Sequence, residues 1–217
     1  MMSLPATLRS SLSEYVRPYL AAGFWDLDDV TCWAFDHAEG LEEHRDEVTA
    51  LVRAMWQDRL AEQARWPDTG DYGRLQSVFE QLESESIVAR MCFSCCGTCA
   101  YHDIASEATW VADGGIREIG YVYFHQQDAY ELGYPEPAVY LGFGSFNPHP
   151  ALPEAIRSAA TAGDEAAMDE ALAQTDVMVG TRVVEIATGH GLSVTWSGSA
   201  AERIEVRLPQ WRKPLPQ

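Results

Sequence analysis

Hydrophobic residues recur at intervals of three and four positions through the N-terminal part of the chain. Leu12, Val16 and Leu20 follow this spacing, and Gly23 stands just beyond them, where a helix can end. A turn-rich connector at 68–73 interrupts the pattern further along. We expect helices over 8–22, 26–37, 41–65 and 75–82. The pattern therefore predicts a helical N-terminal portion.

The period of the hydrophobic pattern shortens after residue 85. Residues 203–208 alternate apolar and polar side chains, which is typical of a strand with one buried face. Helical spacing returns once, at 165–188. We expect strands at 87–93, 119–125, 138–146, 192–196 and 203–208, the last two forming a hairpin. The prediction is an α+β fold: a helical N-terminal portion, then a mainly antiparallel sheet with a packed C-terminal helix and a terminal hairpin.

The connector suggests how the chain is divided. Residues 1–69 form the helical N-terminal portion, and residues 70–217 form the α+β domain. Because the connector is short, the pattern is also compatible with one continuous domain.

Composition narrows the class of protein. The 217 residues are 47% hydrophobic and 22% charged, which is enough to build a buried core. A net charge of −18 disfavours partners such as nucleic acid or an anionic membrane surface. No apolar run approaches the roughly 18 residues of a membrane helix, and no basic-then-apolar segment opens the chain. We expect an acidic, soluble, cytoplasmic protein.

Four of the five cysteines fall within eight positions, as Cys92, Cys95, Cys96 and Cys99. Two Cys-x-x-Cys spacings interlock there. The cluster lies where a predicted strand gives way to a short helical stretch at 100–109, and a helix N-terminus lowers the pKa of a thiol. Any chemistry of this chain is therefore expected at the cluster.

Three interpretations of the cluster remain open. In the first, a metal ion such as zinc is bound by Cys96, Cys99 and His125, with Cys95 and Asp128 as second choices. In the second, Cys-Gly-Thr-Cys between strand and helix is a dithiol redox site. In the third, the cysteines are reduced and pack a buried turn. The sequence does not decide whether the protein is an enzyme.

The segment Phe124-His125-Gln126-Gln127-Asp128 places an imidazole and a carboxylate three positions apart at the end of a predicted strand. Strand side chains alternate, so Phe124 is expected in the core and His125 on a more exposed face. Taken alone, His125 is expected to hydrogen-bond the backbone or Asp128. The lone Cys32, in a helical pattern, is expected to pack in the core.

Several of these residues together resemble a bacterial protein family known as a domain of unknown function. That family has a Trp-Pro…Asp…Arg-Leu lead-in, a Cys-Cys-x-Thr-Cys core and a Phe-x-His-x-Gln-Asp strand. The matching positions here are Trp66-Pro67, Asp71, Arg74-Leu75, Phe79, Leu82, Ile87, Ala89, Cys95-Cys96, Thr98-Cys99, Ile104, Phe124–Asp128 and Tyr140–Gly144. The resemblance implies a shared fold over about residues 66–146 and no particular activity.

Departures from the family pattern also inform the choice of ligands. Ala100 stands where the family has glycine, Asp103 and Gln126 stand where it has glutamate, and His102 has no counterpart.

A rival hypothesis from another functional class is a non-enzymatic module that binds a protein partner through its acidic surface. Exposed apolar surface around Trp25, Trp33 and Trp56 would favour that rival.

Overall fold

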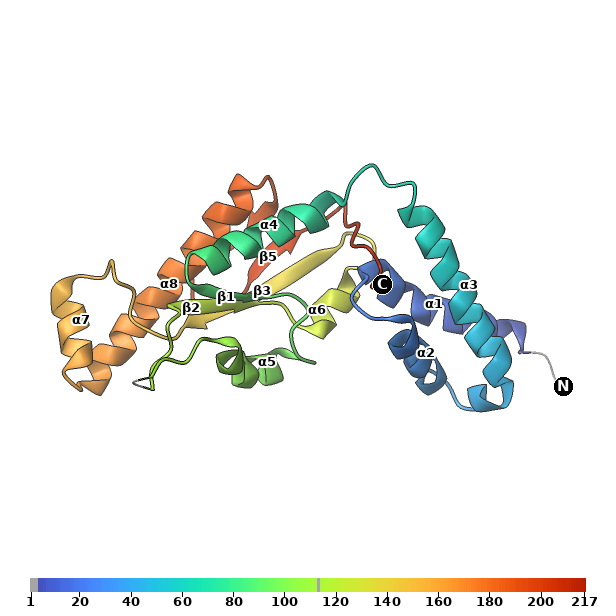
Figure 1. Ribbon diagram of the computed structural model, residues 1–217, viewed down its shortest axis with the longest axis horizontal. Coiled ribbons are helices and arrows are strands. Elements are labelled where there is room, and N and C mark those ends of the chain that lie inside the picture. Colours follow the sequence, from blue (N-terminus) through green and yellow to red (C-terminus); the bar gives the residue numbers. More distant parts are fainter. Residues whose placement is uncertain (1–3, 113) are drawn as a thin grey trace. The chain divides into compact units, whose positions relative to one another are not determined.

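The computed structural model describes residues 4–112 and 114–217, and the chain folds into two compact units. The first unit comprises the chain up to Gly73 together with 129–137 and 209–217, and the second comprises 74–128 and 138–208. Figure 1 labels most of the helices and strands of both units. The division of the chain at residue 69 stays a prediction.

Three helices build the first unit. They are α1 (Ala6–Ala22), α2 (Leu27–Asp36) and α3 (Arg45–Gln63), the last preceded by the 3₁₀ turn η1 (Leu41–His44). Gly23 ends α1 in the left-handed conformation that glycine tolerates best, with φ of 75°. Asp26 begins α2 by accepting a hydrogen bond from the backbone N–H of Asp29. The helices predicted from the hydrophobic period are thus confirmed.

The inward faces of these helices carry the buried side chains Leu12, Val16, Val48 and Val52. Trp25 and Trp56 are buried too, so they do not supply the exposed apolar surface that would favour an interaction module. The prediction for Cys32 is wrong, because its side chain is exposed.

The last residues of the chain return to the first unit. The carboxylate of Asp71 accepts a hydrogen bond of 2.7 Å from the backbone N–H of Gln210. The indole N–H of Trp211 donates to the carbonyl of Ala22 over 3.1 Å. Both the Asp71 and Trp211 side chains are buried, so these bonds anchor the tail to the helices.

A five-stranded sheet organises the second unit. Its strands are β1 (Ile87–Arg90), β2 (Gly120–Tyr123), β3 (Ala138–Ser145), β4 (Ser193–Thr195) and β5 (Ile204–Arg207), in the spatial order β1-β2-β3-β5-β4. β1 and β2 run parallel, and the other neighbours are antiparallel. The predicted α+β fold is confirmed, including the hairpin of β4 and β5.

Helices cover both faces of this sheet (Figure 1). On one face, α5 (Gly97–Asp103) and the 3₁₀ turn η2 (Ile104–Glu107) pack Ala100 and Ile104 against Tyr121 and Tyr123 of β2. The other face is covered by α4 (Gly70–Ser84) and α8 (Glu165–Gly189). There the Phe79 ring of α4 meets Phe124, with ring centroids 6.1 Å apart.

Three elements differ from the pattern-based expectation. Helix α4 begins at Gly70, inside the stretch expected to be a connector. Two short helices, α6 (Gln126–Glu131) and α7 (Glu154–Thr161), were not expected at all. Neither is long enough to establish a clear hydrophobic period, which is why the sequence pattern did not reveal them.

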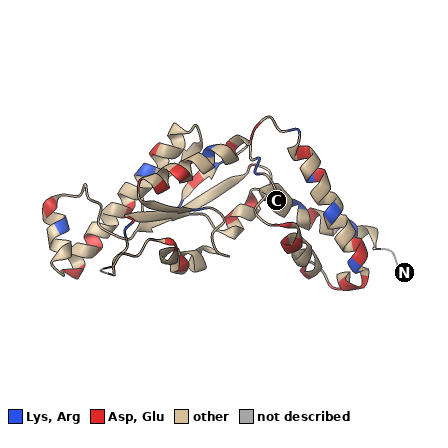
Figure 2. Ribbon diagram, in the orientation of Figure 1, with Lys and Arg blue, Asp and Glu red and all other residues tan. Residues whose placement is uncertain are grey.

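Charged side chains lie along the helices of both units (Figure 2). Among the described residues, no helix is both long enough and apolar enough to cross a lipid bilayer.

Two glycines of α8 offer a matched test of the packing. A Cβ on Gly180 would stand 2.7 Å from Cη2 of Trp196 and 2.8 Å from Cε2 of Phe143, whereas a Cβ on Gly189 would meet nothing within 4 Å. We expect Gly180→Ala to lower the free energy of unfolding by about 1–3 kcal/mol through overpacking. Gly189→Ala should leave it unchanged or raise it slightly. Urea unfolding followed by circular dichroism measures both; equal effects would contradict this packing.

Candidate functional site

The cysteine turn follows β1 and leads into α5. Two residues of the turn, Cys92 and Ser94, have φ of 52° and 58°, in the left-handed region that non-glycine residues seldom occupy. The turn is held by hydrogen bonds from the backbone N–H of Phe93 to the carbonyl of Phe124 (2.8 Å) and from that of Gln126 to the carbonyl of Ser94 (3.1 Å). The strained backbone is thus fixed to the chain that leaves β2.

Three sulfur atoms converge at the end of this turn. The Sγ atoms of Cys95, Cys96 and Cys99 all lie within 4.8 Å of one another. Cys95 is exposed, and the other two are half-buried. Cys92 lies three positions before Cys95, but among the described residues its sulfur atom is not part of this converging group. All five cysteines are free thiols, and none of the cluster is buried as the packing interpretation requires.

Two of these thiols, Cys96 and Cys99, differ in acidity. Cys96 occupies the N-cap position of α5. The pKa of Cys96 is lowered most by a hydrogen bond from the backbone N–H of Cys99. The thiols of Cys99 and Cys95 lower it further. The neighbouring thiols have the opposite effect on Cys99, whose pKa is raised to about 12, chiefly by Cys95 and then by Cys96. Cys96 therefore ionises before Cys99.

His125 and Asp128 form a buried pair beside the turn. Nδ1 of His125 lies 3.1 Å from Oδ2 of Asp128, and the backbone N–H of Asp128 is 3.3 Å from the same Nδ1. Arg203 donates from Nη2 to the Asp128 carboxylate and to the carbonyl of Tyr140. Desolvation is the main cause that lowers the pKa of His125, and Asp128 partly opposes it, so the imidazole is neutral at pH 7.

The expectation that His125 is comparatively exposed is wrong: only 7% of its surface is exposed. The reason is that β2 ends at Tyr123 and the chain enters α6 at Gln126, so strand alternation no longer applies at His125. Phe124 is fully buried, as expected.

The structure brings Cys95, Cys96 and Cys99 together and pairs His125 with Asp128. His125 does not join the mutual 4.8 Å group of the three sulfurs among the described residues. Its ring edge nevertheless faces the turn: a Cβ on Gly97 would stand 3.5 Å from Cδ2 and 3.6 Å from Nε2 of His125. The predicted ligand set of Cys96, Cys99 and His125 stays a prediction.

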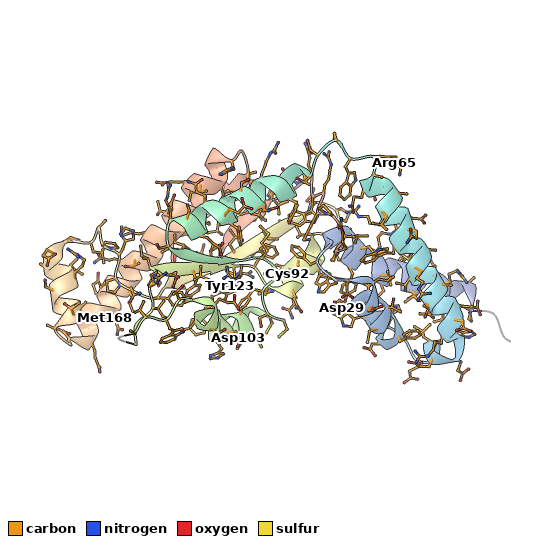
Figure 3. The ribbon with its side chains drawn as sticks, in the orientation of Figure 1. Asp29, Arg65, Cys92, Asp103, Tyr123 and Met168 are labelled. Carbon is orange, nitrogen blue, oxygen red and sulfur yellow. The ribbon has the colours of Figure 1, made fainter. Side chains whose placement is uncertain are left out.

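Two residues of this region were missed by sequence reasoning. The hydroxyl of Tyr123 (labelled in Figure 3) donates to the carbonyl of Gly97 over 3.4 Å. The negative charge of Cys96 adds to the burial that raises the pKa of Tyr123, so the phenol and the thiol lie near each other. Arg203 comes from the loop before β5. Alternation in β2 points Tyr123 toward α5, but no sequence signal marks Arg203.

Comparison with known proteins identifies a family for this chain. One family model, described as "Domain of unknown function (DUF6891)", matches residues 5–215. No curated protein and no solved structure matches the chain.

The lowered pKa of Cys96 predicts selective alkylation. At pH 7 and without metal, iodoacetamide should modify Cys96 faster than Cys99, because the pKa of Cys96 is lowered and that of Cys99 is raised. Mass spectrometry of quenched samples measures both rates. The Cys96 rate should also level off at a lower pH than the Cys99 rate. Equal rates and equal pH profiles would contradict the effect of the α5 backbone.

Proposed function

We propose that this chain, which belongs to the DUF6891 family of proteins of unknown function, binds one zinc ion through the Cys95, Cys96 and Cys99 thiolates. The observation that carries the proposal is the mutual approach of the three Sγ atoms within 4.8 Å. Zinc–sulfur bonds of about 2.3 Å place two sulfurs of a tetrahedral site roughly 3.8 Å apart. A small adjustment of this five-residue turn satisfies that spacing.

Zinc also accounts for the electrostatics of the cluster. The neighbouring Cys95 and Cys96 hinder the ionisation of Cys99, as its raised pKa shows. A divalent cation removes that penalty, because it binds the deprotonated sulfurs and neutralises most of their charge. We place the protein in the cytoplasm, where reduced thiols are available to a metal.

His125 is our proposal for the fourth ligand. Its imidazole is neutral and buried, and its Nε2 edge lies against Gly97, the residue that follows Cys96. In the proposed tautomer Nδ1 carries the proton and donates it to Oδ2 of Asp128, 3.1 Å away, instead of accepting from the Asp128 backbone N–H at 3.3 Å; the Nε2 lone pair is then available. Histidine ligands of metals commonly have such a carboxylate behind them. Closing the distance requires the cysteine turn to move toward the imidazole.

The zinc proposal predicts a stoichiometry. Untagged protein purified under reducing conditions should contain about one zinc per chain by plasma mass spectrometry. Cys96→Ser and Cys99→Ser should each lose most of it, because each removes a thiolate. Cys32→Ser is the matched control and should retain the metal, since Cys32 lies outside the cluster. Wild-type protein that stays metal-free after incubation with zinc would refute the proposal.

The fourth ligand predicts a difference between two histidines. His125→Gln should weaken zinc binding by about tenfold or more in a chelator competition, because one ligand is lost. His102→Gln is the matched control: His102 lies on α5 but outside the group of converging ligand atoms, so its loss should leave affinity unchanged. Equal affinity of the His125 variant and the wild type would leave the fourth position to water.

A dithiol redox activity is the second candidate, favoured by the contrast between Cys96 and Cys99. An acidic thiol at a helix N-cap followed by a less acidic one is the arrangement of an attacking and a resolving cysteine. The pair would reduce a disulfide substrate to two thiols while forming its own disulfide. Metal-free protein with three rather than five titratable thiols after mild oxidation would support this candidate over zinc.

A further inference from the structure

A cavity of about 320 Å³ lies in the second unit, beside the cysteine turn. Its wall includes Gly97 of α5, the phenols of Tyr121 and Tyr123, the Asp176 carboxylate of α8 and Arg203. Its volume is near the lower end for small-molecule sites, so a ligand of few atoms fits it best. Nothing in the proposed zinc site requires this cavity.

The cavity exists because β3 presents glycines to the aromatic residues of β2. Tyr121 pairs with Gly144 and Tyr123 with Gly142. A Cβ on Gly144 would stand 2.5 Å from the Tyr121 hydroxyl, and one on Gly142 would stand 2.9 Å from Cζ of Tyr123. The two rings therefore lie across bare backbone, 6.1 Å apart and inclined by 15°. The pairing of β3 with β5 ends at Leu141, before these glycines.

Three polar groups at this cavity have bonding capacity that the described residues do not use. Tyr121 is only 8% exposed as a residue, and its hydroxyl makes no hydrogen bond within the described part of the chain. Asp176 accepts a 2.6 Å bond from Ser145 at Oδ1, which leaves Oδ2. Arg203 makes its hydrogen bonds through Nη2, which leaves Nε and Nη1. These groups can therefore form hydrogen bonds with a ligand that enters the cavity.

The charges around the cavity restrict that ligand. Arg203 is already balanced by Asp128, and Asp176 and Glu202 add two carboxylates. A simple anion would bind the remaining N–H groups of Arg203 against this surplus of acidic side chains. Burial also raises the pKa of Asp176, which means that its charged form lacks a cationic neighbour. A ligand that carries both a carboxylate and an ammonium group fits these charges. Its carboxylate can bind Arg203, and its ammonium group can supply the cation that Asp176 lacks.

We propose that this cavity binds a small α-amino acid. The carboxylate accepts a charge-assisted hydrogen bond from Nη1 of Arg203, since Nη2 is already used by Asp128 and Tyr140. The ammonium group lies on Oδ2 of Asp176 and donates to the Tyr121 hydroxyl, which completes the unused bonds of both. The side chain of the ligand is limited to a few atoms by the two stacked tyrosine rings.

Calorimetric titration of the full chain tests the proposal, with a chelator present so that metal at the cysteines does not contribute. The probes are glycine, L-alanine, L-serine and L-cysteine. We expect at least one to bind with a Kd of about 1 mM or tighter. Propionate and ethylamine, which each keep one charged group of alanine, should bind about tenfold more weakly or worse. Absence of binding by all four amino acids, or propionate binding as tightly as alanine, overturns the proposal.

Two conservative variants assign the binding to this cavity. Tyr121→Phe removes the hydroxyl but keeps the ring. Asp176→Asn keeps an oxygen for Ser145 but removes the charge. Each variant should bind the amino acid about tenfold more weakly. Asp169→Asn makes the same change on an exposed position of α8 outside the cavity and should have no effect. Circular dichroism confirms that each variant is folded. Wild-type affinity in both cavity variants overturns the proposal, whatever the zinc content is.

Discussion

The site depends on two backbone hydrogen bonds that join the turn after β1 to the chain after β2. They link Phe93 to Phe124 and Gln126 to Ser94. β1 and β2 are the one parallel pair in the described sheet, so their carboxyl ends lie at the same edge. The carboxyl ends of parallel strands are where many α/β folds place ligands. In this otherwise antiparallel sheet, that edge holds both the cysteine turn and the histidine–aspartate pair.

The hydrophobic period was sufficient to predict most of the fold. Helices with a regular inward face, such as α1 and α3, and the alternating strand β5 were placed within a few residues. Short elements were missed, because one or two turns of helix do not establish a period. The miss at α6 changed the site: residue 125 belongs to the entry of a helix, so the face expected for a strand residue did not apply.

The cysteine cluster was visible in the sequence because its members are local. Their spacing alone places three thiols on one turn and the start of one helix, and the structure adds which three converge. The buried network behind it was only partly visible. His125 and Asp128 are three positions apart, but Arg203 reaches Asp128 across 75 positions, a contact that only the pairing of β3 with β5 creates. Long-range contacts of single charged side chains leave no periodic trace in a sequence.

The two glycines of β3 give the cavity a property that can be followed in other members of the family. Backbone alone forms that part of the wall. The cavity is therefore open there only because residues 142 and 144 have no side chain. Tyr121 and Tyr123 therefore have to change together with their partners Gly144 and Gly142 across the strand pair. A relative with a larger residue at either glycine and an unchanged tyrosine would have closed the space. Correlated substitution at these four positions thus distinguishes relatives that keep the cavity from relatives that share only the fold.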